Sequence, residues 1–104
     1  MNWTISVLDF VSSIPKSKEM EVISYQIIKS STSSGANYRA ACRPKSKNDM
    51  INKLKIVEEE LDETQYWLEL IELRYPRTNS KSIQSETNEL LSIIVSSINT
   101  LRKS

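Results

Sequence analysis

The chain has 104 residues, 38% of them apolar and 26% charged, with a formal net charge of +1, which is typical of one globular domain with a single core. One glycine and three prolines argue against strand-rich and loop-rich folds, because tight turns need residues that tolerate positive φ. The absence of histidine excludes catalytic pairs and metal sites that depend on imidazole. We therefore expect a single all-α domain, residues 1–104.

The first two predicted helices span residues 2–14 and 18–43. In the first, apolar residues recur at steps of four and three, as they do on one face of an amphipathic helix. The second follows a turn at Pro15, has Ser17 as its N-cap, and ends before Pro44, which cannot continue a helix.

The third and fourth predicted helices span residues 47–74 and 80–102, on either side of Pro76. The third has the clearest pattern, with one residue per turn in an unbroken four-three spacing: Met50, Leu54, Val57, Leu61, Thr64, Leu68 and Ile71. Short connections make consecutive helices antiparallel neighbours. The sequence thus predicts an antiparallel up-down four-helix bundle with a short first helix.

The first helix is about half as long as the second and third. It would leave part of one groove of the bundle uncovered, and self-association is the commonest way to hide an exposed apolar strip. We therefore expect a homo-oligomer. The alternative is that the side chains at that end are polar enough to tolerate water.

A run of small residues, SSTSSGAN at 30–37, lies inside the second helix although serine, threonine and glycine are poor helix formers. Close approach of a neighbouring helix is our preferred explanation, and a flexible hinge is the alternative. If this segment is buried, its polar groups need partners. We expect a structural polar layer formed by Thr32, Ser33, Asn37, Glu63 and Thr64.

Charge is segregated along the chain. Residues 29–55 carry seven basic residues and one acid, whereas residues 56–73 carry seven acids and no base. In an up-down bundle the turn between the second and third helices lies at the same end as residue 104. Eight basic residues should gather there and attract phosphates: Arg39, Arg43, Lys45, Lys47, Lys53, Lys55, Arg102 and Lys103. The alternative is an ordinary solvated surface.

The remaining features narrow the function further. One glycine cannot build a phosphate-binding loop, and a lone cysteine, Cys42, is expected to be a small packing residue in a helix. We expect no enzyme activity, no cofactor, no metal and no small-molecule substrate. Residues 1–15 do not resemble a signal peptide, and no apolar run is long enough to span a membrane, so we expect a cytoplasmic protein with no membrane contact.

The segment from Gln26 to Leu70 resembles the bacterial four-helix-bundle proteins, some of which are encoded within intervening sequences of 23S ribosomal RNA. The matching pattern comprises a basic residue, a Thr-Ser pair, Gly-Ala-Asn, Ser-Lys-x-Asp and Glu-Thr-x-Tyr-Trp-Leu. In this chain those positions are Lys29, Thr32, Ser33, Gly35, Ala36, Asn37, Ser46, Lys47, Asp49, Glu63, Thr64, Tyr66, Trp67 and Leu68. The chain departs from the pattern at Lys29, often arginine, at Ser34, often aliphatic, and at Ala40, often acidic.

The resemblance implies an oligomeric binding protein. Similar proteins include the accessory subunits of diversity-generating retroelements, which form pentamers and associate with a reverse transcriptase and nucleic acid. Carried over, this implies a homo-oligomer, with five copies as the suggested stoichiometry, whose basic end contacts RNA or a nucleic-acid-bound protein partner. The competing hypothesis is a purely structural protein–protein adaptor that binds no nucleic acid.

Overall fold

The computed structural model of the chain describes residues 2–104. Within that range the chain forms four α-helices, one short 3-10 helix and no strand. These elements are α1 (Asn2–Ser12), α2 (Lys18–Ala41), α3 (Lys47–Arg74), η1 (Pro76–Thr78) and α4 (Lys81–Lys103). The all-α fold with a short first helix is confirmed, and each predicted helix end lies within two residues of the observed one.

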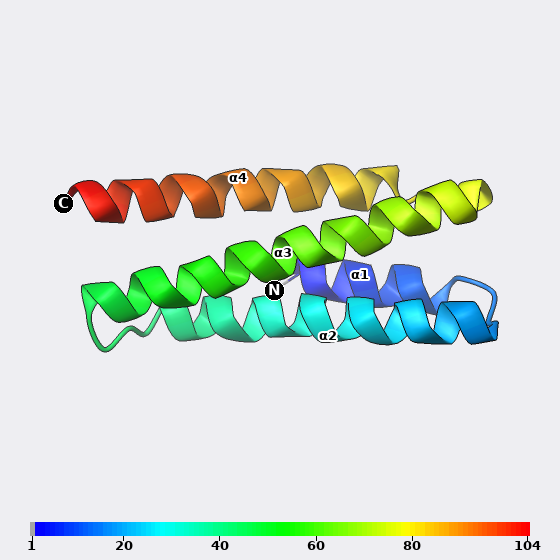
Figure 1. Cartoon of the computed structure of the whole chain (residues 1–104), viewed down its shortest axis with the longest axis horizontal. Coiled ribbons are helices and arrows are strands. Elements are labelled where there is room, and N and C mark those ends of the chain that lie inside the picture. The colour runs from blue at the N-terminus through cyan, green and yellow to red at the C-terminus, as the bar shows by residue number, and fades with distance from the viewer. Residues whose placement is uncertain (1) are drawn as a thin grey trace.

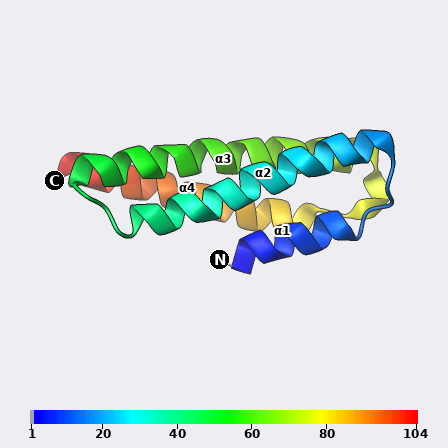
Figure 2. The same ribbon diagram turned by 90° about the horizontal axis from the view of Figure 1, so that it is seen from below.

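The helices form an elongated up-down bundle that measures 47 × 20 × 19 Å (Figure 1). Each helix contacts the next one along the chain, and α1 also contacts α4, which closes the bundle. Figure 2 shows that α1 covers only the part of the bundle near the α1–α2 turn, while α2, α3 and α4 continue past its N-terminus. The far half of the molecule is therefore a three-helix arrangement.

Serine caps begin the two longest helices. The hydroxyl of Ser17 accepts the N–H of Met20 at 3.1 Å, and that of Ser46 accepts the N–H of Asp49 at 3.0 Å. Each bond satisfies one of the amides that a helix N-terminus leaves without an intrahelical partner. α4 begins differently, because Ser80 makes no side-chain cap and the carboxylate of Glu72 instead accepts from the N–H and hydroxyl of Ser80.

The core follows the predicted apolar stripes. In α3, six of the seven predicted seam positions are buried and only Met50 is half-buried. In α1 the buried residues are Trp3, Val7 and Val11, with Ile14 just beyond the helix, and Phe10 is half-buried. Val11, rather than the neighbouring Phe10, therefore completes the inward face of α1 with Trp3, Val7 and Ile14.

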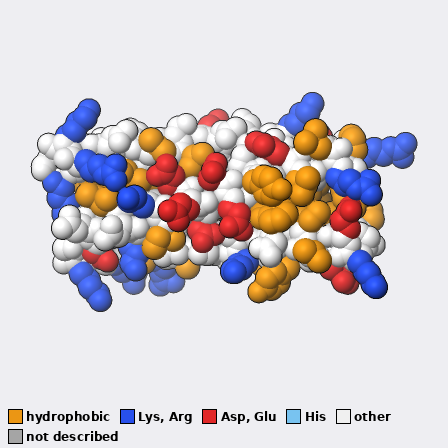
Figure 3. Space-filling view, in the orientation of Figure 1, with side chains coloured by type: hydrophobic (Ala, Val, Ile, Leu, Met, Phe, Trp, Pro, Cys, Tyr) orange, Lys and Arg blue, Asp and Glu red, His pale blue; other side chains and the backbone are white. Residues whose placement is uncertain are grey.

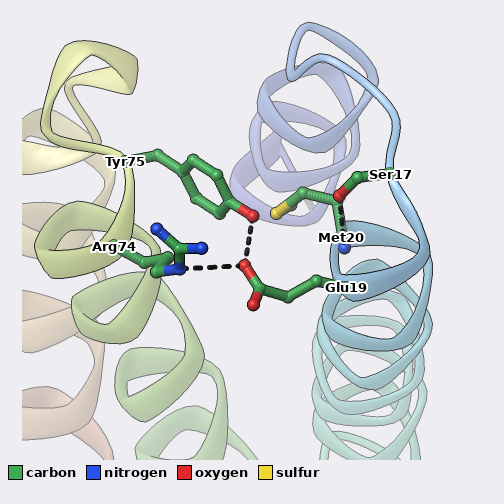
Figure 4. Close-up of polar contacts among 5 residues, drawn as sticks. All are labelled: Ser17, Glu19, Met20, Arg74 and Tyr75. Carbon is green, nitrogen blue, oxygen red and sulfur yellow. Dashed lines mark hydrogen bonds and ion pairs between the residues drawn. The ribbon is translucent and has the colours of Figure 1, made fainter.

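The end of the bundle that holds the α1–α2 turn is closed by a small polar cluster (Figure 4). The carboxylate of Glu19 accepts a hydrogen bond from the hydroxyl of Tyr75 and pairs with Arg74, whose Nε lies 3.1 Å away. Because the bond to Glu19 stabilises the protonated hydroxyl, the pKa of Tyr75 is raised. This cluster ties the start of α2 to the end of α3.

Candidate nucleic-acid interface

The opposite end of the bundle brings together the segments that carry the eight predicted basic residues. The α2–α3 turn and the C-terminal end of α4 lie side by side there (Figure 1). The ammonium of Lys47, at the start of α3, donates to the backbone carbonyl of Ser104. We call this surface the basic pole, and its residues are Arg39, Arg43, Lys45, Lys47, Lys53, Lys55, Arg102 and Lys103.

The charges of the basic pole are accessible to solvent. Seven of its eight side chains belong to exposed residues, and Lys53 is half-buried. Within residues 2–104 the one ion pair is that between Arg74 and Glu19, at the other end of the bundle. No cation of the pole therefore lies within ion-pair distance of an Asp or Glu carboxylate in residues 2–104. Lys47 is bonded to Ser104, and the exposed cations can bind anionic groups from outside.

Asp49 is the one acidic residue between Lys29 and Lys55, and its carboxylate is already engaged by the backbone. It accepts the N–H of Lys45 at 3.1 Å, which fixes the α2–α3 turn. The acid therefore stabilises the turn that presents the lysines and leaves the pole strongly positive.

Basic residues also lie at the far end of the bundle, so the two ends differ in their balance of positive and negative charge. That end holds Lys16, Lys18, Arg74, Arg77 and Lys81, accompanied by acids that include Glu19 and Glu72. Figure 3 shows Lys and Arg side chains at both ends and a group of acidic side chains between them. Eight cations and one acid at the basic pole, against a mixed population at the other end, give the molecule its charge asymmetry.

The acidic residues of α3 repel one another. Burial and the neighbouring Glu63 carboxylate raise the pKa of Glu60 above its ordinary value.

Within residues 2–104, no cluster of three or more His, Cys, Asp or Glu side chains has a metal-binding arrangement. Over the same residues, no helix is long and apolar enough to cross a membrane.

The buried polar layer differs from the predicted one. Of its five predicted members only Thr64 is buried; Ser33 and Asn37 are half-buried, and Thr32 and Glu63 are exposed. The inward face of α2 continues the spacing of Ile23 and Ile27, which brings other serines inside. The buried polar residues are Ser30, Ser31, Ser34, Thr64, Gln65, Ser80 and Thr87.

Ser30 and Thr64 form the centre of this layer, with 2.7 Å between their hydroxyl oxygens. The side chain of Asn37 instead donates to the carbonyl and hydroxyl of Ser33, one turn earlier in the same helix. The hydrogen bond between Trp3 and Thr87 on α4 was not predicted, although each residue falls on the four-three spacing of its own helix.

Cys42 is exposed, which contradicts its expected role in packing.

The structure thus defines the class of the fold, a small elongated bundle of four helices with basic residues gathered at one end. The sequence matches the family described as 23S rRNA-intervening sequence protein over residues 1–96, and the chain belongs to that family. Among curated proteins, none matches the sequence.

The fold is also similar to a crystal structure of a protein of unknown function from the S23 ribosomal protein family of Bacteroides thetaiotaomicron. The two chains share 36% sequence identity and superpose with a TM-score of 0.77. The match covers 91% of this chain and 87% of the other. The four-helix arrangement is therefore shared by a relative of nearly equal length.

Proposed function

We propose that this protein is a non-enzymatic binding module whose basic pole contacts the phosphates of RNA. The observation that carries the proposal is the set of eight cationic side chains with no Asp or Glu carboxylate within ion-pair distance in residues 2–104. Phosphate contacts of this kind supply most of the affinity of sequence-independent nucleic-acid binding. The family takes its name from an intervening sequence of 23S ribosomal RNA, so RNA is the nucleic acid that we choose to test.

Three cations of the pole lie at the ends of three different helices. Arg39 lies in the last turn of α2, Lys47 in the first turn of α3, and Arg102 in the last turn of α4. Three helix ends therefore present charge to a single ligand. Because such contacts recognise the backbone, the pole would read the shape and charge density of RNA more than its sequence.

The wider proposal is a cytoplasmic homo-oligomer, with a pentamer as the implied stoichiometry, that binds either RNA or a nucleic-acid-bound protein such as a reverse transcriptase. The exposed apolar residues support self-association, since Leu73 and Ile93 are 81% and 58% exposed. The second candidate function is a protein–protein adaptor that binds no nucleic acid. The separation of the basic pole from the acidic part of α3 favours that alternative, because opposite charges could pair between copies.

Fluorescence anisotropy with a labelled RNA stem-loop distinguishes the two functions. One triple variant replaces Lys45, Lys47 and Lys103 by alanine, and a matched variant replaces Lys16, Lys18 and Lys81 at the other end. Both lose three positive charges, so any difference reports position. We expect the first to weaken binding about tenfold or more at low salt and the second to change it much less. Equal losses, or no binding by the unmodified protein, would contradict the proposal.

A further inference from the structure

A hollow between α1 and α2 lies next to the basic pole. It encloses about 680 Å³, and ligand sites in proteins typically have volumes of roughly 300–1,000 Å³. Figure 2 shows α2 beside α1 and continuing past its N-terminal end toward the pole. The lining includes one residue of α1, four of α2 and one that follows α2: Ile5, Gly35, Ala36, Tyr38, Arg39 and Arg43. We call it the α1–α2 hollow.

The α1–α2 hollow offers exposed apolar surface beside a bare stretch of helix. Ile5 and Tyr38 are 57% and 40% exposed. Gly35 and Ala36 have no side-chain atom beyond Cβ, so a ligand can approach the backbone of α2 closely there. A flat ligand that covers Tyr38 would therefore remove apolar surface from water.

Positive charge borders the same hollow. Arg39 and Arg43 stand four residues apart, both are exposed, and neither lies within ion-pair distance of an Asp or Glu carboxylate in residues 2–104. None of the nine described residues that line the hollow is acidic, and α2 has no acid after Glu21. Guanidinium groups bind phosphate through paired, directional hydrogen bonds. The hollow therefore suits a ligand that has both a flat apolar part and an anionic part.

A nucleotide without a base-pairing partner has this chemistry. Proteins bind such nucleotides by stacking the base on an aromatic side chain while cations hold the phosphates of the backbone. A paired base is stacked between its neighbours inside the A-form helix, so it cannot lie on Tyr38. The hollow thus favours unpaired over paired nucleotides.

A second hollow between α1 and α2, at the other end of the bundle, lacks this combination. It is lined by Tyr25 and Lys16 but also by Glu21, whose carboxylate repels phosphate. Tyr25 is 63% exposed and lies on α2, as Tyr38 does. Tyr25 is therefore the matched position for a control substitution.

We infer that the α1–α2 hollow binds an unpaired nucleotide of RNA, with its base stacked on Tyr38 and its phosphates held by Arg39 and Arg43. The inference deepens the proposed function and rests on it. Because both arginines also belong to the basic pole, an RNA strand whose phosphates bind the pole already lies at the edge of the hollow. The preferred ligand is then an RNA helix that continues into unpaired nucleotides.

Three labelled RNAs test the site by fluorescence anisotropy. The first is a stem-loop with a short unpaired tail, the second has a tail of the same length without bases, and the third has no tail. The first two carry equal numbers of phosphates, so a difference between them reports contact with the bases. We expect the unmodified protein to bind the tail with bases at least about fivefold more tightly than the abasic tail, from stacking on one aromatic side chain.

Substitutions then locate the contact. Tyr38→Leu removes the ring and keeps an apolar side chain, so we expect it to bind the two tailed RNAs equally. Tyr38→Phe keeps the ring and should keep the preference, as should the control Tyr25→Leu. The preference is a ratio of two affinities of one variant, so a change in overall affinity cancels. If circular dichroism shows that Tyr38→Leu fails to fold, Ala36→Leu fills the hollow from an exposed position and should likewise abolish the preference.

Equal binding of the two tailed RNAs by the unmodified protein would overturn the inference. A preference that survives Tyr38→Leu or Ala36→Leu, or that is lost in Tyr25→Leu, would do the same. If alanine at Lys45, Lys47 and Lys103 weakens binding of the stem-loop without a tail while no base preference exists, the hollow fails and the basic pole stands. A base preference that depends on Tyr38, in a protein whose triple variant binds as tightly as its control, overturns the pole alone. No binding of any of the three RNAs overturns both.

Discussion

Trp3 on α1 donates its indole N–H to the hydroxyl of Thr87 on α4, with 2.9 Å between nitrogen and oxygen. Trp3 is 2% exposed and Thr87 is fully buried. The Thr87 hydroxyl in turn donates to the carbonyl of Ile83 at 2.7 Å. This chain of bonds fixes the N-terminal end of α1 against α4.

Breaking this bond should destabilise the bundle. Thr87→Val leaves a buried indole N–H without its acceptor, and we expect a loss of about 1–3 kcal/mol in the free energy of unfolding. Trp3→Phe should cost a similar amount. The double variant should lose less than the sum of the two, because the second change removes a bond that is already broken. Urea denaturation measures all three, and strictly additive losses would show that the bond contributes little.

Ser34 should respond to alanine in the opposite sense from Ser30. The hydroxyl of Ser34 is buried with no hydrogen-bond partner in residues 2–104, whereas that of Ser30 is bonded to Thr64. Ser34→Ala removes an unsatisfied polar atom and adds a better helix former, so it should stabilise the protein by about 1 kcal/mol. Ser30→Ala should destabilise it. Thermal unfolding compares the pair, and shifts of the same sign would refute this account of the layer.

Gly35 should be replaceable by alanine once Thr4 is trimmed. A Cβ at position 35 would lie 3.2 Å from the hydroxyl oxygen of Thr4, which is a tight contact. In a helix, alanine is favoured over glycine by about 1 kcal/mol. Gly35→Ala should therefore gain little by itself and about 1 kcal/mol in a Thr4→Ala background. The same gain in both backgrounds, measured by urea denaturation, would mean that α1 does not limit the size of residue 35.

Glu72 makes stability depend on pH in the acid range. The N–H and hydroxyl of Ser80 donate to its carboxylate and lower the pKa of Glu72 below its ordinary value of 4.5. The unfolded chain then binds the proton more readily, so the contribution of Glu72 is full above 4.5 and is lost as the pH falls through the lowered pKa. We expect the stability difference between the unmodified protein and Glu72→Gln to shrink on acidification. A difference that is constant from pH 7 to pH 3 would contradict this role.

The sequence predicts the helices better than it predicts their contacts. The seam of α3 is evident because apolar residues recur at four-three spacing from Leu54 to Ile71, interrupted only at Thr64, and the burial of these residues agrees. The polar layer is harder to predict because residues 30–37 are eight consecutive small or polar residues. Their hydrophobicity does not indicate which side of the helix faces the core. Extending the spacing from Ile27 would have selected Ser30 and Ser34 in place of Thr32 and Ser33.

The candidate site is predictable only in part for the same reason. Short turns place Arg43 and Arg102 at one end of any up-down bundle, so the basic pole follows from topology and charge alone. By contrast, the hydrogen bond that the Asp49 carboxylate accepts from the backbone depends on the conformation of the α2–α3 turn. The bond that Thr87 accepts depends on how α1 packs against α4. Such contacts between distant residues leave no periodic trace in one sequence.

The salt dependence of RNA binding tests the central claim, contact between the basic pole and phosphates, most directly. The measurement is the slope of log K against log salt concentration, for the unmodified protein and for the variant with alanine at Lys45, Lys47 and Lys103. Each phosphate contact contributes about 0.7–0.9 to the slope, so the variant should have a slope smaller in magnitude by about 2 to 3. Binding that is independent of salt, or an unchanged slope in the variant, would contradict the claim.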